Sequence, residues 1–340
     1  MPRSELTIDV GALRRNVRTL LRALDGAALW AVVKADGYGH GAVDVSRAAL
    51  DAGASALCVA TIPEALELRT PFPDARILCM SPFDADEIRG ARDANVEIAY
   101  SGGELPDGVR IHVKLDTGMG RYGISELPAR TRAVVGLMSH LATADTDPAF
   151  ARAQVRRFDE MVGPYRGELE CHIANSAAAL RLPEARFDAA RCGVAIYGLS
   201  PFGDDPGADG LEPVLSWRSR LAQVKLLHAG ESTGYRRRFV AERPTWIGLV
   251  PVGYADGFRR DLTGTRVLVG GEPAEVVGTV SMDSFAVRLP HELPAGTPVT
   301  LIGDGVGAES HAMVSGTINY EIVTGIESDP RRATREVVET

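Results

Sequence analysis

The chain has 340 residues, of which 45% are hydrophobic and 24% are charged, so it is long enough for about two domains of roughly 150 residues each. These proportions are ordinary for a globular enzyme and exclude a disordered chain, a fibrous repeat and a disulfide-rich scaffold. The 37 Lys and Arg residues against 45 Asp and Glu residues give a net charge of −8. Without a long basic stripe, this charge excludes a nucleic-acid-binding protein.

Segments typical of membrane and exported proteins are missing from the sequence. It has no run of 18 or more apolar residues, so no membrane-spanning helix is expected. The first residues lead into a strand-like alternation rather than into the apolar core of a signal peptide. The four cysteines lie in apolar runs without zinc-binding spacing and are expected to be reduced (Cys58, Cys79, Cys171 and Cys192). These features predict a cytoplasmic protein.

The first 200 residues alternate short apolar segments with segments of helical pattern. A strand is expected over Leu6–Val10, followed by a helix to about Leu24. Eight apolar runs then predict parallel strands covered on both faces: Leu29–Ala35, Ala56–Ala60, Arg76–Ser81, Val96–Tyr100, Val109–Asp116, Val135–Leu141, Leu169–Asn175 and Phe187–Tyr197. Helices are expected over His40–Ala52, Pro63–Arg69, Ala85–Asn95 and Ala149–Tyr165. Eight such units indicate a TIM-like (β/α)8 barrel, whose functional site lies at the carboxyl ends of the strands.

Two connections in this barrel are short. Residues 101–108 separate one pair of predicted strands, and the stretch from residue 123 to residue 134 is also brief. A parallel crossover normally needs about a dozen residues or more. We therefore expect one or two outer helices to be missing.

The pattern changes after Gly198. Residues 200–210 are rich in Gly, Pro and Asp, a composition typical of a linker. The barrel is therefore assigned to residues 11–199, and residues 211–340 are predicted to form a mainly antiparallel β domain. Residues 1–10 could join that domain as an additional strand. Its strands are expected within Leu215–Leu227, Thr245–Val252, Thr265–Val269, Ala274–Val280, Ser284–Leu289 and Pro298–Ile302.

Lys34 ends the first predicted barrel strand, and a glycine-spaced segment, DGYGHG, follows it at residues 36–41. Burial lowers the pKa of a lysine, as imine formation with a carbonyl cofactor requires. An isolated lysine at such a place is more often a salt-bridged or snorkelling side chain. A glycine-spaced turn that opens a helix, however, allows close approach of a phosphate. Together these residues indicate pyridoxal 5′-phosphate (PLP).

Further motifs follow along the chain in a fixed order. They are DTGMGRYG at 116–123, SHLATAD at 139–145, HIANS at 172–176, RCGVAIYG at 191–198, Tyr235, GYADG at 253–257, SMD at 281–283 and INYE at 318–321. Together with residues 34–41, they resemble the alanine racemase family over nearly the whole chain. The resemblance implies a PLP-dependent enzyme of fold-type III that interconverts L-alanine and D-alanine and supplies D-alanine for bacterial cell-wall peptidoglycan.

The resemblance implies a two-base mechanism. Racemisation needs acid–base groups on both faces of a planar carbanion, because a single base mainly returns the proton to the side it left. Lys34 resembles the base that also carries the cofactor, acting on the D form, and Tyr235 resembles the base that acts on the L form. Without the resemblance, Tyr235 would be taken as a packed tyrosine of the β domain. Arg236–Arg238 depart from the small residues common in the family, and nearby cations lower the pKa of a phenol.

The resemblance also implies how the cofactor is held. Arg191 would donate a hydrogen bond to the pyridine nitrogen and keep it unprotonated, which weakens the ring as an electron sink. His140 would lie beside the cofactor and His172 behind Arg191. The phosphate would be bound by Tyr38, Ser176, Tyr320 and the backbone N–H groups of Gly193 and Val194. Ser176 could also be the N-cap of the helix that follows it.

Substrate recognition is implied for Arg121, which would attract the carboxylate, and for Met282. Lys114 matches a lysine that is often carbamylated in the family and that positions the arginine. An unmodified lysine would bring two cations close together, so a carbamate is electrostatically reasonable. Tyr254 and Asp283 are expected to support these residues. No metal site is expected.

The resemblance further implies a homodimer in which the β domain of one subunit completes the barrel mouth of the other. Three alternatives remain. A racemase for serine or for a broader set of amino acids would differ in pocket volume, set partly by Tyr254, Met282 and Tyr320. A non-catalytic barrel protein of PLP homeostasis would lack the β domain. A fold-type III decarboxylase would carry an acidic residue in place of Arg191.

Overall fold

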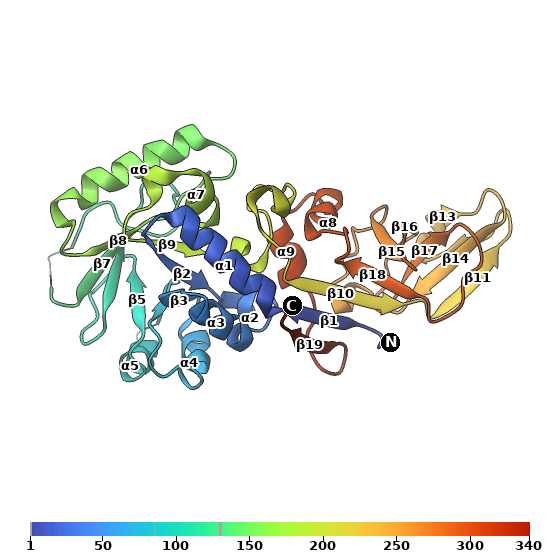
Figure 1. Ribbon diagram of the computed structural model, residues 1–340, viewed down its shortest axis with the longest axis horizontal. Helices are drawn as coiled ribbons and strands as arrows, with labels where there is room; N and C mark the ends of the chain where they lie inside the picture. Colours follow the sequence, from blue (N-terminus) through green and yellow to red (C-terminus); the bar gives the residue numbers. More distant parts are fainter. Residues whose placement is uncertain (1, 85, 129–130) are drawn as a thin grey trace. The chain divides into compact units, whose positions relative to one another are not determined.

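The computed structural model describes residues 2–84, 86–128 and 131–340, which form two compact units (Figure 1). One unit contains residues 11–212. The other joins the start of the chain, up to Val10, to residues 213–340. Among the described residues, no helix is long and apolar enough to cross a membrane.

The first unit is built around a closed barrel of eight parallel strands in the order β2-β3-β4-β5-β6-β7-β8-β9. Most residues of these strands are buried, because helices cover the outside while side chains fill the interior. This is the predicted fold class, which is confirmed. The strands are β2 Ala28–Val32, β3 Ala56–Val59, β4 Ile77–Cys79, β5 Glu97–Tyr100, β6 Ile111–Lys114, β7 Val134–Met138, β8 Glu170–His172 and β9 Ala189–Cys192.

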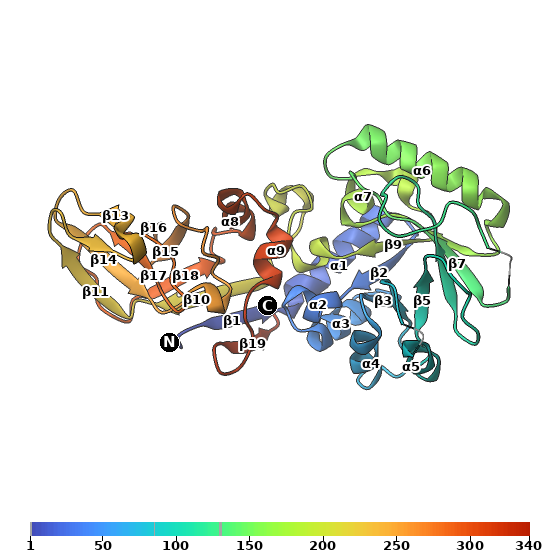
Figure 2. The ribbon, with the colours of Figure 1, turned by 180° about the vertical axis from the view of Figure 1, so that it is seen from behind.

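Helices surround most of the barrel (Figure 2). They are α1 Val10–Leu24, α3 Ala42–Asp51, α4 Ile62–Arg69, α5 Glu87–Asp93, α6 Pro148–Val162 and α7 Ser176–Arg181. Local capping explains several boundaries. For example, Asp147 accepts hydrogen bonds from the N–H groups of Ala149 and Phe150, and Pro148 occupies the first turn of α6. The predicted start of α5 at Ala85 lies outside the described residues. In the short connections 101–110 and 115–133, the described residues form no helix.

The second unit is built on a nine-stranded sheet in the order β11-β14-β17-β16-β15-β18-β10-β1-β19. Its strands are β1 Glu5–Asp9, β10 Leu215–Arg220, β11 Gln223–Leu227, β14 Thr245–Val250, β15 Arg266–Val269, β16 Glu272–Val277, β17 Phe285–Leu289, β18 Pro298–Ile302 and β19 Thr334–Val338. The opening strand pairs antiparallel with β10 and parallel with β19. Two helices, α8 Ala308–Ser315 and α9 Asn319–Thr324, complete the unit.

The structure differs from the predicted elements in several places, and the helices α8 and α9 of the β unit were not predicted. The alternating segment predicted over residues 215–227 contains two strands, β10 and β11. The edge strand β19 was not predicted, because its residues are largely exposed and lack an apolar face. The expected linker, residues 200–210, belongs to the barrel unit, where Arg181 pairs with Asp209 at 2.9 Å.

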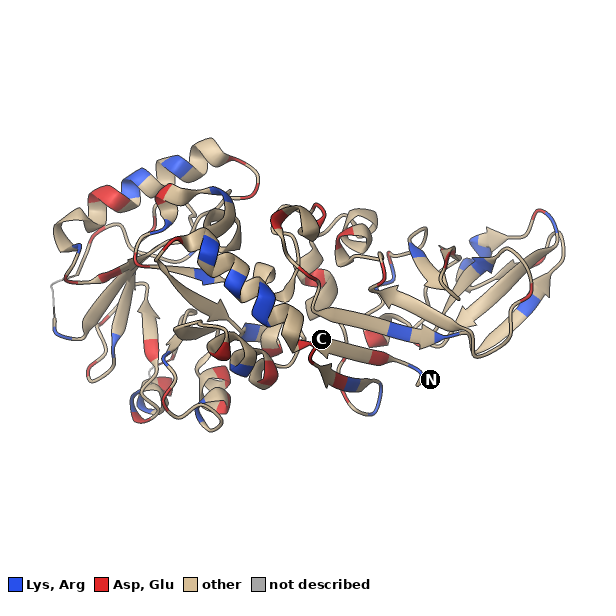
Figure 3. Cartoon of the chain, viewed as in Figure 1, with Lys and Arg blue, Asp and Glu red and all other residues tan. Residues whose placement is uncertain are grey.

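Acidic residues are distributed among the basic ones in both units (Figure 3). Even the basic surface of α1 has acidic partners. Arg14 pairs with Asp51 at 3.4 Å, and Arg15 pairs with Glu212 at 2.9 Å. The four cysteines are buried free thiols.

Candidate active site

Lys34 lies two residues beyond the end of β2, at the carboxyl end of the barrel strand. The residues that follow it form a left-handed turn, with φ of +52° at Ala35, +49° at Asp36, +60° at Gly37 and +55° at Tyr38. This conformation costs roughly 1–2 kcal/mol for each residue other than glycine. The predicted strand therefore ends earlier than Ala35, and a strained turn stands next to the lysine.

Side chains hold this turn in place. The N–H group of Ala35 donates to Oε1 of Glu64 at 2.8 Å. The N–H group of Ala42 donates to Oδ1 of Asp36 at 2.7 Å and connects the turn to the start of α3. Strain of this kind persists where the surroundings fix the conformation, which is common at functional sites.

Several cations gather at this end of the barrel. Burial lowers the pKa of Lys34, and the charge of Arg121 lowers it further, whereas Glu64 acts in the opposite direction. Burial lowers the pKa of Lys114 to about 8, with further contributions from Arg191, Arg121 and Lys34. Lys114 is only 7% exposed. These lysines therefore lose their protons more readily than lysines in water, and the site attracts anions.

Arg191 is buried at the centre of this region. Its Nη2 donates to the carbonyl oxygen of Ser139 at 2.6 Å, and its Nη1 donates to that of His172 at 3.2 Å and also contacts Nδ1 of His172. Burial lowers the pKa of Arg191 to about 10, so it still carries its proton at neutral pH. Nη2 lies 3.4 Å from Nδ1 of His140. Burial, together with the charge of Arg191, lowers the pKa of His140 to about 3, which keeps His140 neutral.

A chain of hydrogen bonds continues from Arg191 into the barrel interior. Nε2 of His172 lies 2.8 Å from Nδ1 of His112, and Nε2 of His112 lies 2.8 Å from Oε2 of Glu97. Since a carboxylate only accepts, His112 donates to Glu97, His172 donates to His112, and Arg191 donates to His172. Burial lowers the pKa of His172 well below its usual value. We call Arg191, His172, His112 and Glu97 the histidine relay.

The sequence predictions missed His112 and Glu97. His112 lies two residues before Lys114 on β6, so the two side chains share the inward face of the strand. That alternation could have identified it. Glu97 is a charged residue at the head of an apolar run and is only 1% exposed. A buried charge needs partners, but nothing local in the sequence says which they are.

Tyr38, Ser176 and Gly193 form a compact group at another part of the barrel mouth. Oγ of Ser176 accepts a hydrogen bond from the N–H group of Gly193 at 3.1 Å. A Cβ atom at position 193 would lie 2.4 Å from Oη of Tyr38, so any larger residue there would displace the tyrosine ring. The ring of Tyr38 stacks on Tyr197 at 4.8 Å between centroids. Val194 follows as the first residue of a 3-10 turn, Val194–Tyr197.

This set of donors fits a phosphate. The hydroxyl groups of Tyr38 and Ser176 lie beside the backbone of a tight turn, as in many phosphate sites. Ser176 is not the N-cap of α7, so that alternative is wrong. The cap is Asn175, whose side chain accepts from the N–H group of Ala178 at 3.0 Å. The hydroxyl of Ser176 is therefore not used to end the helix.

The remaining predicted site residues belong to the β unit. Tyr235 lies between the short strands β12 Ser232–Thr233 and β13 Phe239–Val240. It is 67% exposed, Met282 is 53% exposed and Tyr254 is 43% exposed. A cavity of about 540 Å³ is lined by Gly234, Tyr235, Ser281, Met282, Asp283 and Ser284. Tyr320, on α9, is half-buried.

Of the arginines after Tyr235, Arg237 is held by hydrogen bonds within its own hairpin. Arg236 and Arg237 have φ of +63° and +50°. The guanidinium of Arg237 donates to Oγ of Ser232 and to the carbonyl oxygen of Gly230, both at 3.1 Å. Arg237 is thus engaged by its own hairpin.

The architecture defines a class of two-domain proteins that combine a barrel, with a buried lysine site at its strand ends, and a mainly antiparallel β domain. Residues 8–201 match the family model of the alanine racemase N-terminal domain, and residues 214–334 match that of the C-terminal domain. Alanine racemase of Ligilactobacillus salivarius is 39% identical, over 95% of this chain and 96% of its own. Alanine racemase 1 of Bacillus subtilis is also 39% identical, over 94% and 90%.

A solved structure supports the same assignment. The alanine racemase from D-cycloserine-producing Streptomyces lavendulae superposes with a TM-score of 0.92 at 36% identity, and the match covers 100% of this chain and 98% of that one. The chain belongs to the alanine racemase family.

Proposed function

We propose that the protein is an alanine racemase that interconverts L-alanine and D-alanine with PLP and provides D-alanine for bacterial peptidoglycan. One observation carries the proposal. Lys34, whose pKa is lowered by burial, stands at the carboxyl end of β2, in the same barrel mouth as the donor group of Tyr38, Ser176 and Gly193. A reactive lysine beside a phosphate-binding group is the combination that PLP requires.

The residues of both units would share the cofactor. Nζ of Lys34 would link to it covalently, and His140 and Arg191 would face its ring, with Arg191 donating to the pyridine nitrogen. When bound, PLP supplies an electron sink that stabilises negative charge on the substrate Cα. Its phosphate would be bound by the hydroxyls of Tyr38, Ser176 and Tyr320 and by the N–H groups of Gly193 and Val194.

Two bases would then move the proton. Oη of Tyr235 takes the proton from Cα of L-alanine, and Nζ of Lys34 delivers a proton to the opposite face. The reverse direction exchanges the two roles. The lowered pKa of Lys34 helps, because a base works best when its pKa lies near the working pH.

Arg121 and Met282 would bind the substrate, supported by Tyr254 and Asp283. A carbamate on Lys114 would place a negative charge among Arg191 and Arg121. Its formation consumes a neutral amine and CO₂ and releases a proton, so a pKa of about 8 favours it. The enzyme is proposed to act in the cytoplasm as a homodimer. The exposed Tyr235, Tyr254 and Met282 support the dimer, because a partner would cover these side chains.

The test is incubation of the purified protein with PLP and L-alanine, followed by chiral chromatography. D-alanine should accumulate until the two enantiomers are equal, and the Lys34→Ala variant should produce none. Conversion of L-serine at a comparable rate would favour the broader racemase. Release of CO₂ would favour a decarboxylase, and absence of any reaction would contradict the proposal.

A further inference from the structure

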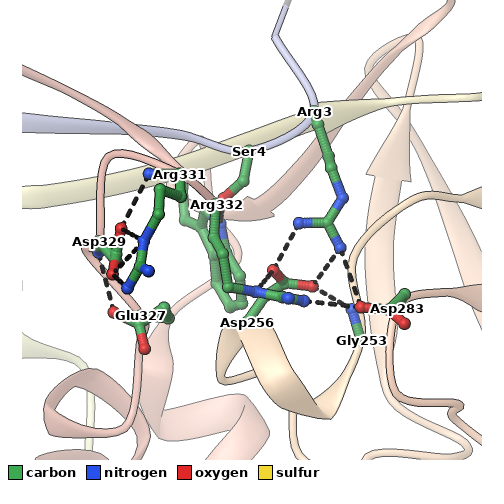
Figure 4. Close-up of polar contacts among 10 residues, drawn as sticks. Arg3, Ser4, Gly253, Asp256, Asp283, Glu327, Asp329, Arg331 and Arg332 are labelled. Carbon is green, nitrogen blue, oxygen red and sulfur yellow. Dashed lines mark hydrogen bonds and ion pairs between the residues drawn. The ribbon is translucent and has the colours of Figure 1, made fainter.

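Four charged residues from separate segments of the β unit meet in one cluster (Figure 4). Arg3 donates to both carboxylate oxygens of Asp256, at 2.6 and 2.8 Å. Arg332 donates from Nε to Asp256 at 2.9 Å and from Nη2 to Oδ1 of Asp283 at 2.7 Å. We call these four residues the Asp256 cluster. Its formal charges cancel, and its centre, Asp256, is only 2% exposed.

The two acidic residues belong to loops that are locked together. The N–H group of Tyr254 donates to the carbonyl oxygen of Ser281 at 3.0 Å, and the N–H group of Ala255 donates to that of Met282 at 3.0 Å. A Cβ atom at Gly253 would lie 2.3 Å from the carbonyl oxygen of Ser281, so the loops touch through their backbones. These loops, residues 253–257 and 281–284, present the exposed side chains of Tyr254 and Met282.

The two basic residues come from opposite ends of the chain. Arg3 precedes β1, and its carbonyl oxygen accepts from Oγ of Ser219 at 2.6 Å. Arg332 precedes β19, in a turn where its N–H group donates to the carbonyl oxygen of Asp329 at 2.8 Å. Both ends are therefore fastened to the loops that carry Tyr254 and Met282.

Stability alone is a weak reason for such a cluster. Only Asp256 is buried, whereas Arg3 and Arg332 are about one-third exposed and Asp283 is 61% exposed, and ion pairs between partly exposed groups contribute little to stability. The best-attested use of a buried charge such as that of Asp256 is to select one arrangement. One arginine would neutralise Asp256, yet both arginines also reach Asp283 in the second loop, Arg332 at 2.7 Å and Arg3 at 3.7 Å. The contact with Asp283 fixes the position of loop 281–284 relative to loop 253–257.

We propose that the Asp256 cluster positions Tyr254 and Met282 for substrate binding, with Arg3 and Arg332 as positioning residues supplied by the chain ends. The inference rests on the proposed function, because it assigns the loop pair 253–257 and 281–284 to the alanine site. The inference goes beyond the proposed function, because it makes Arg3, before β1, and Arg332, before β19, part of substrate recognition.

The test compares Arg332→Ala with Arg331→Ala. Arg331 is the adjacent arginine and pairs with Asp329 rather than with the Asp256 cluster, so it is a matched control. Arg332→Ala should raise KM for both enantiomers of alanine about tenfold and change kcat much less, because a displaced binding loop weakens positioning. Arg331→Ala should leave both constants unchanged. Arg332→Lys, which cannot bridge two carboxylates in the same way, should give an intermediate KM.

A second measurement does not depend on activity. In enzyme labelled with ¹³C at the methionine methyl groups, the Met282 signal is assigned by its loss in Met282→Leu. Arg332→Ala should shift or split that signal, and Arg331→Ala should not. The proposal is overturned by an unchanged KM and Met282 signal in Arg332→Ala, or by equal effects of the two alanine variants. It is also overturned if both Arg332 variants lose kcat in proportion to lost folded protein. An inactive wild-type enzyme would contradict the proposed function, and the Met282 signal would still decide the role of the cluster.

Discussion

Lys34 and Tyr235 have different surroundings, which matters for the proposed exchange of roles between them. Lys34 is partly buried beside a strained turn and has a lowered pKa, whereas Tyr235 is two-thirds exposed on a short hairpin. A phenol and a lysine amine in such different environments need not be equally sensitive to substitution. Substitution of one base should therefore affect proton removal from one enantiomer of alanine more than from the other.

Tyr235→Phe should affect the two enantiomers unequally. It removes only the phenolic hydroxyl, so the absorbance of the cofactor linked to Lys34 should persist. Exchange of the α-proton of L-alanine with deuterium from heavy water should fall by about 10²–10⁴, the usual contribution of a general base. Exchange from D-alanine should persist far better. Equal losses for both enantiomers would indicate a damaged pocket or a single base.

Gly193→Ala should weaken PLP binding. The added methyl group would lie 2.4 Å from Oη of Tyr38, and such overpacking costs about 1–3 kcal/mol, which corresponds to about fivefold to 150-fold in affinity if the cost falls on the PLP-bound state. Titration of the apoenzyme with PLP measures the change. Gly163→Ala is the control, because its methyl group would meet no atom within 4 Å.

A second variant identifies the cause of that loss. Tyr38→Phe removes the hydroxyl with which the methyl group collides. Adding Gly193→Ala to Tyr38→Phe should therefore cost less than adding it to the wild type. Additive losses would show that the collision is not the reason.

At the scale of elements, the histidine relay connects four barrel strands. Glu97 starts β5, His112 lies on β6, His172 ends β8 and Arg191 lies on β9. Trp30 of β2 packs on the rings of both histidines, with centroid distances of 5.6 and 4.5 Å. Because the carboxylate of Glu97 can only accept a hydrogen bond, it sets the donor and the acceptor in every other bond of the relay.

Glu97 should make the protein sensitive to acid. Burial raises the pKa of Glu97, but hydrogen bonds from His112 and Arg76 outweigh that effect and lower the pKa to about 2. A carboxyl whose pKa is lower in the folded state stabilises it above the unfolded pKa of about 4.5, and this contribution is lost as the pH falls toward 2. The contribution is about 3 kcal/mol. Glu97→Gln should flatten the fall in unfolding free energy between pH 4.5 and 2, measured by urea unfolding, and an unchanged slope would refute this.

The barrel strands could be predicted from the sequence, whereas the contacts between them could not. Apolar runs predicted all eight barrel strands, because both faces of a parallel strand are buried. Glycine spacing drew attention to residues 36–41, but a run of positive φ at Ala35, Asp36 and Tyr38 is set by distant partners such as Glu64. The relay and the Asp256 cluster join residues far apart in the chain. Pairings of that kind depend on strand order, which no local pattern contains.

At the scale of the whole molecule, the proposed site residues are divided between the two units. Lys34, Arg121 and Arg191 belong to the barrel unit, whereas Tyr235 and Met282 belong to the β unit. In the proposed homodimer, each site would take its lysine from one chain and its tyrosine from the other. Such sharing makes dimerisation a condition for activity.

Mixing two inactive variants should restore activity. A dimer of one Lys34→Ala chain and one Tyr235→Phe chain would have one site with both bases and one site with neither. Random exchange gives heterodimers in about half of the dimers, so about a quarter of wild-type racemase activity should return. Mass spectrometry of differently tagged chains confirms exchange. A mixture that stays inactive after exchange would show that each site is formed within one chain.

The left-handed turn after Lys34 has backbone angles that suit a D-residue better than an L-residue. By mirror symmetry, the backbone angles that strain L-residues there are those that D-residues prefer. Ala35 is exposed, with φ of +52° and ψ of +53°. A semisynthetic chain with D-alanine at position 35 should therefore be more stable by about 1–2 kcal/mol, as unfolding by denaturant would reveal. The proposed product of the enzyme, built into its own backbone, would fit this turn better than the residue that translation places there.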